Sequence, residues 1–238
     1  MNFAVDLGNT NSKLGVFKQD QLIDHLELSG DQNTIDYINQ NSPGRLIIGS
    51  VRENVGGFVQ KLKLNGTCFV LDHKTPIPIN IKYKTPESLG VDRIALAVGA
   101  ADQIPSNDCL VIDVGTCITY DFVDKQGNYW GGAISPGVGI KFRSLNTYTA
   151  NLPLVEIKKQ PELIGQNTAE SIQSGVVNGT LAEIESLIKL FQERVGELKV
   201  ILTGGDASLF ASGIKATNRV IPELVLIGLN RILLYNEK

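Results

Sequence analysis

The chain has 238 residues, a hydrophobic content of 42% and a formal net charge of −3 at pH 7. This length is sufficient for one large domain or two small ones with a proper core. The acidic balance lacks the excess of positive charge that binding to a phosphate backbone requires, so no nucleic acid is expected as a partner. Small molecules are therefore the expected ligands.

The cysteines, the histidines and the apolar runs exclude further classes. Cys68, Cys109 and Cys117 show neither Cys-x-x-Cys spacing nor an even count, which argues against a zinc site and a disulfide framework. With only two histidines, acid–base chemistry would rest on carboxylates. No stretch approaches the roughly 18 apolar residues of a membrane span, and the first apolar run has no basic leader. We therefore expect a cytoplasmic protein that does not enter a membrane.

The first part of the chain shows the order of elements of a ribonuclease-H-like lobe. Apolar runs bounded by turn residues predict three antiparallel strands, followed by a helix, a strand, a helix and a closing strand. Prolines then predict an extended, irregular segment over residues 74–86. The expected strands are 2–7, 13–18, 22–28, 45–51 and 68–71, and the expected helices are 34–39 and 58–64.

The chain turns polar around residues 104–108, which we interpret as the boundary between a lobe of residues 1–107 and a lobe of residues 108–238. Before it, a helix is expected over 91–101, and after it the pattern of the N-terminus returns. Asn167 and Glu170 resemble a capping box at the start of a long helix. The expected strands are 110–114, 117–124, 129–134 and 199–202, residues 136–139 break the pattern, and a terminal helix follows residue 222.

An Asp-x-Gly turn between two strands occurs twice, at Asp6 and at Asp113. An acid in an apolar strand is costly to bury unless cations or hydrogen-bond donors meet it. The glycine that follows permits a tight reversal and the close approach of a ligand. A single Asp-x-Gly is most often a simple hairpin turn, but two copies at the start of two lobes indicate phosphate turns that face one nucleotide.

Three further features leave alternatives open. Asp92 lies in a glycine-led helix start and could accept a substrate proton, or it could cap its helix and pair with Arg93 on the surface. Gly204 and Gly205 follow a strand and could host a nucleoside, or could only reverse the chain. Gly175 and Gly179 could lie in a helix–helix interface or pack inside one lobe.

Together these motifs resemble those of the type III pantothenate kinases, which belong to the superfamily of acetate and sugar kinases, Hsp70 and actin. The resemblance covers nearly the whole chain. It rests on residues 6–10, 90–93, 113–116, 131–137, 168–175 and 203–206. It implies an α/β fold of two ribonuclease-H-like lobes, with mixed sheets flanked by helices and ATP in the cleft between the lobes.

The resemblance further implies ATP-dependent phosphorylation of the pantothenate 4′-hydroxyl, the first step toward coenzyme A. It assigns Asp92 as the proton acceptor and Asp113 as the ligand of a monovalent cation, potassium or ammonium, with Mg²⁺ accompanying ATP. Positions that match pantothenate contacts are Tyr83, Gly90, Val91, Asp92, Arg93 and Thr168. Positions that match or are expected to hold ATP are Asp6, Leu7, Gly8, Asn9, Thr10, Asn11, Ser12, Lys13, Thr116, Gly204 and Gly205.

Members of this family are homodimers, and the resemblance implies that Thr168 reaches the pantothenate site across the dimer interface. Lys13 could approach a phosphate, but an exposed strand lysine is the simpler interpretation. Thr85-Pro86 stands where members often carry Asn-Pro, which leaves the shape of the substrate wall open. Two other functions compete: a small-sugar kinase or polyphosphate phosphatase on the same fold, and a nucleotide-binding regulatory protein without transferase activity.

Overall fold

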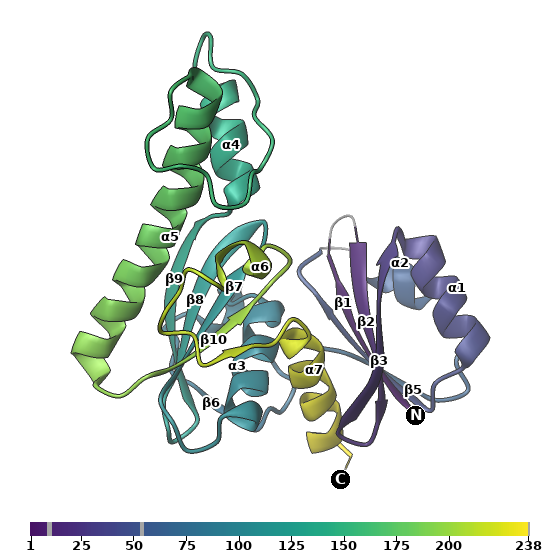
Figure 1. Ribbon diagram of the computed structural model, residues 1–238. Helices are drawn as coiled ribbons and strands as arrows, with labels where there is room; N and C mark the ends of the chain where they lie inside the picture. The colour runs from purple at the N-terminus through teal and green to yellow at the C-terminus, as the bar shows by residue number, and fades with distance from the viewer. Residues whose placement is uncertain (9–10, 53–54, 238) are drawn as a thin grey trace. The chain divides into compact units, whose positions relative to one another are not determined.

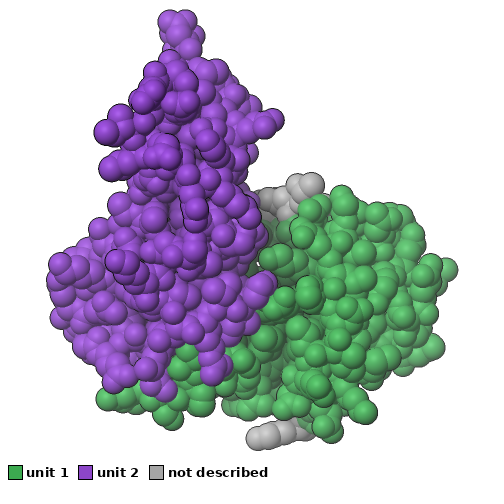
Figure 2. All heavy atoms as spheres, in the orientation of Figure 1, with its two compact units in different colours: residues 1–106, 123–130, 223–238 green, residues 107–122, 131–222 purple. Residues whose placement is uncertain are grey.

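The computed structural model describes residues 1–8, 11–52 and 55–237, so Asn9 and Thr10 of the expected ATP segment lie outside it. The chain forms two compact units (Figure 2). Unit 1 consists of Met1–Ser106, Val123–Trp130 and Glu223–Lys238, and unit 2 of Asn107–Phe122 and Gly131–Pro222. The lobe boundary expected at residues 107 and 108 stays a prediction.

The first sheet belongs to unit 1 and has the strand order β3-β2-β1-β4-β5 (Figure 1). Its first three strands pair antiparallel, as the sequence predicts, and β4 and β5 add on in parallel. The strands are β1 (Asn2–Leu7), β2 (Asn11–Lys18), β3 (Gln21–Ser29), β4 (Arg45–Ser50) and β5 (Thr67–Val70).

Helices cover both faces of this sheet. On one face α1 (Asp31–Asn41) and α2 (Gly56–Val59) bury Ile35, Ile38 and Phe58 against alternate residues of β1. On the other face lies α7 (Leu224–Tyr235), whose Asn230 accepts a hydrogen bond of 3.3 Å from the Asn2 amide.

Two glycines let α3 (Val91–Gln103) and α7 approach each other at backbone distance within unit 1. A Cβ at Gly228 would collide with the Ala95 carbonyl, and a Cβ at Gly99 would lie 2.6 Å from the Leu224 carbonyl oxygen. Neither position tolerates a side chain without separating the helices. This close packing places the start of α3 on a rigid support.

The second sheet has the strand order β11-β10-β7-β8-β9-β6. Its β7 and β10 run parallel, with Asp113 opposite Thr203, and β10 pairs in parallel with β11. The short β6 pairs in parallel with the start of β9. The strands are β6 (Asn80–Ile81), β7 (Cys109–Val114), β8 (Cys117–Val123), β9 (Asn128–Pro136), β10 (Lys199–Thr203) and β11 (Arg219–Val220).

The core of unit 2 lies between this sheet and its helices, α4 (Val138–Thr147), α5 (Thr168–Val195) and α6 (Ala207–Phe210). Alternate β7 residues such as Ile112 pack against Ile184 of α5, which is the long helix predicted from the sequence. The loop before α5 is tied to this helix by a 2.6 Å bond from the Ser174 hydroxyl to the Leu163 carbonyl.

Some elements differ from the sequence-based expectation. Helix α2 occupies residues 56–59 rather than 58–64, because Phe58 is its buried anchor while Lys61 to Leu64 alternate in polarity. Helix α4 was not expected, because the glycines at 137 and 139 were interpreted as a break in the pattern. Gly137 nevertheless serves as its N-cap, where a Cβ would collide with the Gly115 and Thr116 carbonyls.

Several other boundaries differ by a few residues. The extended segment 74–86 contains β6 and ends in the 3-10 turn η1 (Pro86–Ser88). The short α6 and β11 follow the Gly-Gly turn of unit 2 and were not expected either. None of the helices in the described part of the chain combines the length and hydrophobicity that a membrane crossing needs.

Candidate nucleotide and substrate site

The end of β1 brings Asp6 beside charges from two other elements. Asp6 pairs in register with Lys13 of β2. The pKa of Asp6 is raised to about 6, first by burial and second by the Asp92 carboxylate, while the Lys13 ammonium acts to lower it. Lys13 is thus a half-buried neighbour of the Asp-x-Gly turn and not an exposed strand lysine.

Gly8 at the end of β1 lies close to the start of β2, which carries a buried hydroxyl. A Cβ at Gly8 would lie 2.7 Å from the Asn11 carbonyl oxygen, so this position requires glycine. Leu7 and Ser12 pair across the strands and are each 1% exposed. Among the described residues the Ser12 hydroxyl has no hydrogen-bond partner. A buried hydroxyl without a partner is costly, and a ligand in the turn could supply one.

Asp92 lies in the first turn of α3. Its Oδ1 accepts a 2.9 Å hydrogen bond from the Arg93 N–H, and a Cβ at Gly90 would collide with this oxygen. Glycine at position 90 therefore leaves the carboxylate its space. The alternative of a surface ion pair between Asp92 and Arg93 does not hold, because Arg93 is only 7% exposed.

The Arg93 guanidinium lies over one aromatic ring, which in turn lies near a second ring. Its carbon lies 6.0 Å from the centre of the Tyr83 ring, which in turn lies 6.2 Å from the Tyr129 ring. The Lys82 N–H donates to the Tyr129 carbonyl at 2.8 Å, so the segment that carries Tyr83 is fixed to β9. Tyr129 was not singled out from the sequence, since a buried tyrosine in a strand has no local signature.

In unit 2, Asp113 at the end of β7 lies against the glycine turn that follows β10. Gly204 has a φ of +99°, and a Cβ there would collide with both Asp113 Oδ1 and the Val114 carbonyl. The neighbouring Gly205 is exposed and has open space around it. Burial raises the pKa of Asp206, whose N–H donates to the Val114 carbonyl at 2.9 Å. The two motifs thus form one oxygen-rich corner.

The second Asp-x-Gly turn is a tight reversal like the first. The Gly115 N–H donates to the Cys117 carbonyl at 2.9 Å, and the Gly137 N–H donates to the Thr116 carbonyl at 3.0 Å. Thr116 is exposed. Its side chain is therefore available to a ligand at the same corner as Asp113.

Thr168 is the first residue of α5, and the expected capping box is present. The Asn167 side chain accepts a 3.0 Å bond from the Glu170 N–H, and the Glu170 carboxylate accepts one of 2.9 Å from the Gln166 N–H. The alternative of Gly175 and Gly179 packing inside the lobe is not observed, because both are exposed and a Cβ at either would meet open space. An exposed stripe of small residues runs along this helix: Thr168, Ser171, Gly175, Gly179, Ala182 and Ser186.

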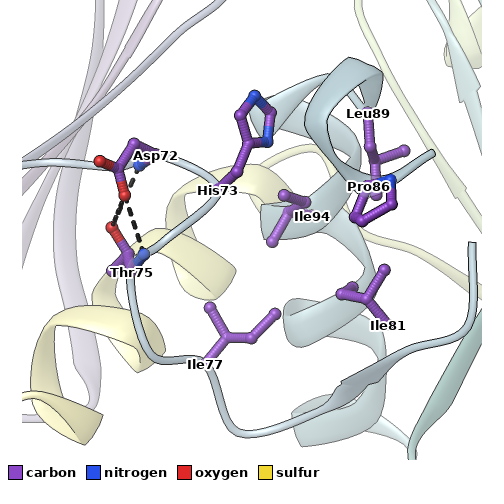
Figure 3. A pocket seen from close by; sticks show the side chains of 8 residues that line it. All are labelled: Asp72, His73, Thr75, Ile77, Ile81, Pro86, Leu89 and Ile94. Carbon is purple, nitrogen blue, oxygen red and sulfur yellow. Dashed lines mark hydrogen bonds between the residues drawn. The ribbon is translucent and has the colours of Figure 1, made fainter.

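A cavity within unit 1 is lined by residues of α3, of η1 and of the segment before them, but it is not a substrate site. Figure 3 shows it between Ile77, Ile81 and Ile94, with the Asp72 carboxylate bonded to Thr75 at its edge. Its volume is about 30 Å³, and one water molecule occupies roughly 10–15 Å³ on the same measure. Neither a nucleotide nor its phosphate groups could enter it.

Comparison with known proteins identifies the family. The family model of type III pantothenate kinase matches residues 2–190. A curated protein of this name from Cytophaga hutchinsonii is 42% identical over 236 residues, which cover 99% of this chain and 100% of the relative. The chain belongs to the type III pantothenate kinase family. Another curated member, from Phocaeicola vulgatus, is 39% identical over 245 residues, with complete coverage of both chains.

Solved structures agree with this family at the level of the fold. A Campylobacter jejuni protein described as belonging to the Baf family of transcriptional activators has a TM-score of 0.68 at 21% identity, with 98% of each chain covered. An inorganic polyphosphate/ATP-glucomannokinase from Arthrobacter has a TM-score of 0.50 at 14% identity, with 98% of each chain covered. The family member thus has the α/β fold of the actin-like ATPases and sugar kinases, as the sequence predicts.

Proposed function

We propose that the chain transfers the γ-phosphoryl group of ATP to the 4′-hydroxyl of pantothenate, the first step of coenzyme A synthesis. Membership of the family supports the substrate and the reaction. The single observation that carries the mechanism is the cluster of Asp6, Lys13 and Asp92 within unit 1. Phosphoryl transfer depends mainly on placing the nucleophile and on managing charge, and this cluster holds the groups for both tasks.

Asp92 acts in this proposal as the general base. It accepts the proton of the pantothenate hydroxyl while the oxygen of that hydroxyl attacks the γ-phosphorus. The bond from the Arg93 N–H orients its Oδ1, and the missing side chain at Gly90 leaves room for this orientation. Tyr83, Gly90, Val91 and Arg93 would form the wall of the pantothenate site, which the ring contacts of Arg93 support.

The Asp6 to Lys13 segment and Thr116 bind the phosphates of ATP in this proposal, and the turn of Gly204 and Gly205 hosts its nucleoside. Gly8 lets a ligand approach the backbone, Ser12 offers a hydroxyl without a partner among the described residues, and Lys13 supplies positive charge. Mg²⁺ bound to ATP takes most of its ligands from phosphates and water.

Asp113 is proposed as the ligand of a monovalent cation. One carboxylate next to peptide oxygens is an all-oxygen donor set with little negative charge, which suits a singly charged hard cation. The crowding of Gly204 against Asp113 Oδ1 and the Val114 carbonyl supports such a corner. The cation would supply positive charge near the phosphates, and Asp113 would hold it there.

A homodimer completes the site in this proposal. The small exposed side chains along α5 permit another helix to approach closely, as the helix of a second copy would. Thr168 heads this stripe and would reach the pantothenate of the partner subunit. A cytoplasmic location stays part of the same proposal.

A coupled assay tests the function directly. Purified protein with ATP, Mg²⁺ and potassium should convert pantothenate to 4′-phosphopantothenate, identified by its mass, and should leave a panel of sugars unchanged. Phosphorylation of a sugar in preference to pantothenate, or of neither, would contradict the proposal.

A further inference from the structure

The carboxylate of Glu183, on α5, bonds to three neighbouring elements of unit 2. Its Oε2 lies 2.6 Å from the Lys141 ammonium of α4, and its Oε1 accepts a 3.1 Å bond from the Tyr120 hydroxyl of β8. The Ser135 hydroxyl, near the end of β9, also donates to this carboxylate. One side chain of the long helix thus connects two strands and the helix that follows them.

These contacts hold the carboxylate in its charged form. Partial burial alone would raise the pKa of Glu183, but the hydrogen bonds and the positive charge of its partners outweigh this effect and hold the pKa below its usual range. The Lys141 ammonium is held from a second side by the Thr180 hydroxyl, which lies 3.0 Å away on a residue that is 1% exposed. Because partly buried charges are costly unless they are paired, the network is a structural feature and not a loose surface ion pair.

The partners of Glu183 lie on both sides of the glycine that packs against the second Asp-x-Gly turn. The Gly137 N–H donates to the Thr116 carbonyl at 3.0 Å, and the Gly137 carbonyl accepts a 3.0 Å bond from the Lys141 N–H. A Cβ at Gly137 would collide with two carbonyls of this turn, so the two backbones are in direct contact. Glu183 therefore holds the segment of residues 135–141 at both ends, while the middle of this segment supports the turn.

We propose that Glu183 is a positioning residue for the Thr116 turn, which rests on the proposed role of Thr116 in binding the phosphates of ATP. Glu183 acts through the segment of residues 135–141 and does not touch the nucleotide. A turn that is already placed loses less conformational freedom when a ligand binds. Glu183 therefore raises the affinity for ATP, while the pantothenate wall proposed in unit 1 does not depend on it.

Two hydroxyl substitutions within this network provide a matched test. Ser135→Ala removes a bond between Glu183 and the supporting segment, while Thr180→Val removes the buried hydroxyl beside Lys141 and leaves the contact of Lys141 with Glu183. Calorimetry on the full chain measures the affinity for ATP, and the coupled assay gives the KM values for ATP and pantothenate. Ser135→Ala should weaken ATP binding about tenfold, as expected for one hydrogen bond to a charged group. Its KM for pantothenate should change little, and Thr180→Val should behave as the wild type.

A double-mutant cycle shows whether Glu183 acts through Ser135. Glu183→Gln alone should weaken ATP binding about tenfold or more, because the amide lacks the charge that aligns its partners. In the Ser135→Ala background the same change should have a smaller effect, since one link to the turn is already broken. If Glu183→Gln does not fold, Glu183→Asp takes its place in the cycle. This variant keeps the charge but is too short to reach both sides of the segment, and it should also bind ATP more weakly.

The outcomes distinguish this inference from the function on which it rests. Unchanged ATP affinity in folded Ser135→Ala, with a wild type that binds ATP, would overturn the inference alone. Fully additive effects in the cycle, an equal rise of both KM values, or an equal loss of ATP affinity in Thr180→Val would also overturn it, because each indicates a general change of packing. A wild type that does not bind ATP would overturn the proposed function, and this inference with it.

Discussion

The carboxylate of Asp92 raises the pKa of Asp6, although the two residues lie 86 positions apart and on different elements of unit 1. A pair of acids in which each disfavours the ionisation of the other destabilises the folded state. Such pairs are concentrated at functional sites. This relationship motivates the first two predictions.

Asp92→Asn should nearly abolish phosphorylation. The amide cannot accept the hydroxyl proton, and general-base help is typically worth roughly 10²- to 10⁴-fold in kcat. The KM for pantothenate should change little. Asp102→Asn is the matched control, because Asp102 lies at the other end of α3 and forms an ion pair of 3.3 Å with Arg231. Full turnover by Asp92→Asn would remove this residue from the mechanism.

Asp6→Asn should make the protein more stable and less active. Since the pKa of Asp6 is raised from 3.8 to about 6, the stability that its neutral form provides is complete below about pH 3.8 and is lost as the pH rises through about 6. The asparagine should therefore raise Tm at pH 8 by roughly 2–4 °C, and the gain should shrink toward pH 4. Thermal unfolding at both pH values measures this, and a lower Tm at pH 8 would contradict the pKa assignment.

Gly90→Ala should lower kcat without unfolding the protein. The added Cβ would meet the end of a flexible side chain, Asp92 Oδ1, so the carboxylate moves while the backbone stays. A displacement of about 1 Å in a catalytic group can cost about 10²-fold in rate. Gly44→Ala is the control, because a Cβ there lies at an ordinary 3.6 Å from the Met1 carbonyl oxygen. Equal rates for the two variants would argue against a requirement for space at Gly90.

Replacing potassium with sodium should lower activity through the corner at Asp113. Asp113→Asn should lower activity in potassium and remove most of the difference between the two salts, because the carboxylate would no longer hold the cation. Initial rates at constant ionic strength measure this dependence. If the variant retained the full preference for potassium, the cation would have to bind elsewhere.

Gly175→Arg should separate the proposed dimer and lower activity with it. A long charged side chain in the middle of the small-residue stripe of α5 prevents the approach of a second helix. Light scattering after size exclusion gives the mass, and the coupled assay gives the rate. Gln192→Arg, exposed near the end of the same helix, should remain dimeric. A wild type that is monomeric in solution would refute the interface.

The sequence predicted those parts of the fold that depend on neighbouring residues. The antiparallel β1–β3 meander follows from apolar runs between turn residues, and the start of α5 from the Asn167 and Glu170 capping box. In both cases the interactions that decide the structure lie within a few residues. The local sequence pattern alone was therefore sufficient to predict these two elements.

Contacts between distant segments were not predictable in this way. Arg52 bonds to the Gly8 carbonyl, 44 positions away, and nothing in the local pattern distinguishes it from a surface arginine. Gly137 was interpreted as a chain break, whereas its lack of a side chain is required by the carbonyls of Gly115 and Thr116. The residues of the site were predicted from the resemblance to the family's motifs. The structure adds the contacts of Asp6, Gly90 and Tyr83 within unit 1.

The close packing of α3 against α7 also bears on the order of folding during synthesis. The helix that begins with the proposed catalytic segment is covered by residues 224–235, which leave the ribosome after the other segments of unit 1. Domains generally fold as units while the chain emerges. Here the segments of unit 2 are made before α7, and unit 1 must wait for this helix. A chain interrupted before residue 224 would therefore expose the apolar surface of α3, which marks it for degradation before an incomplete enzyme accumulates.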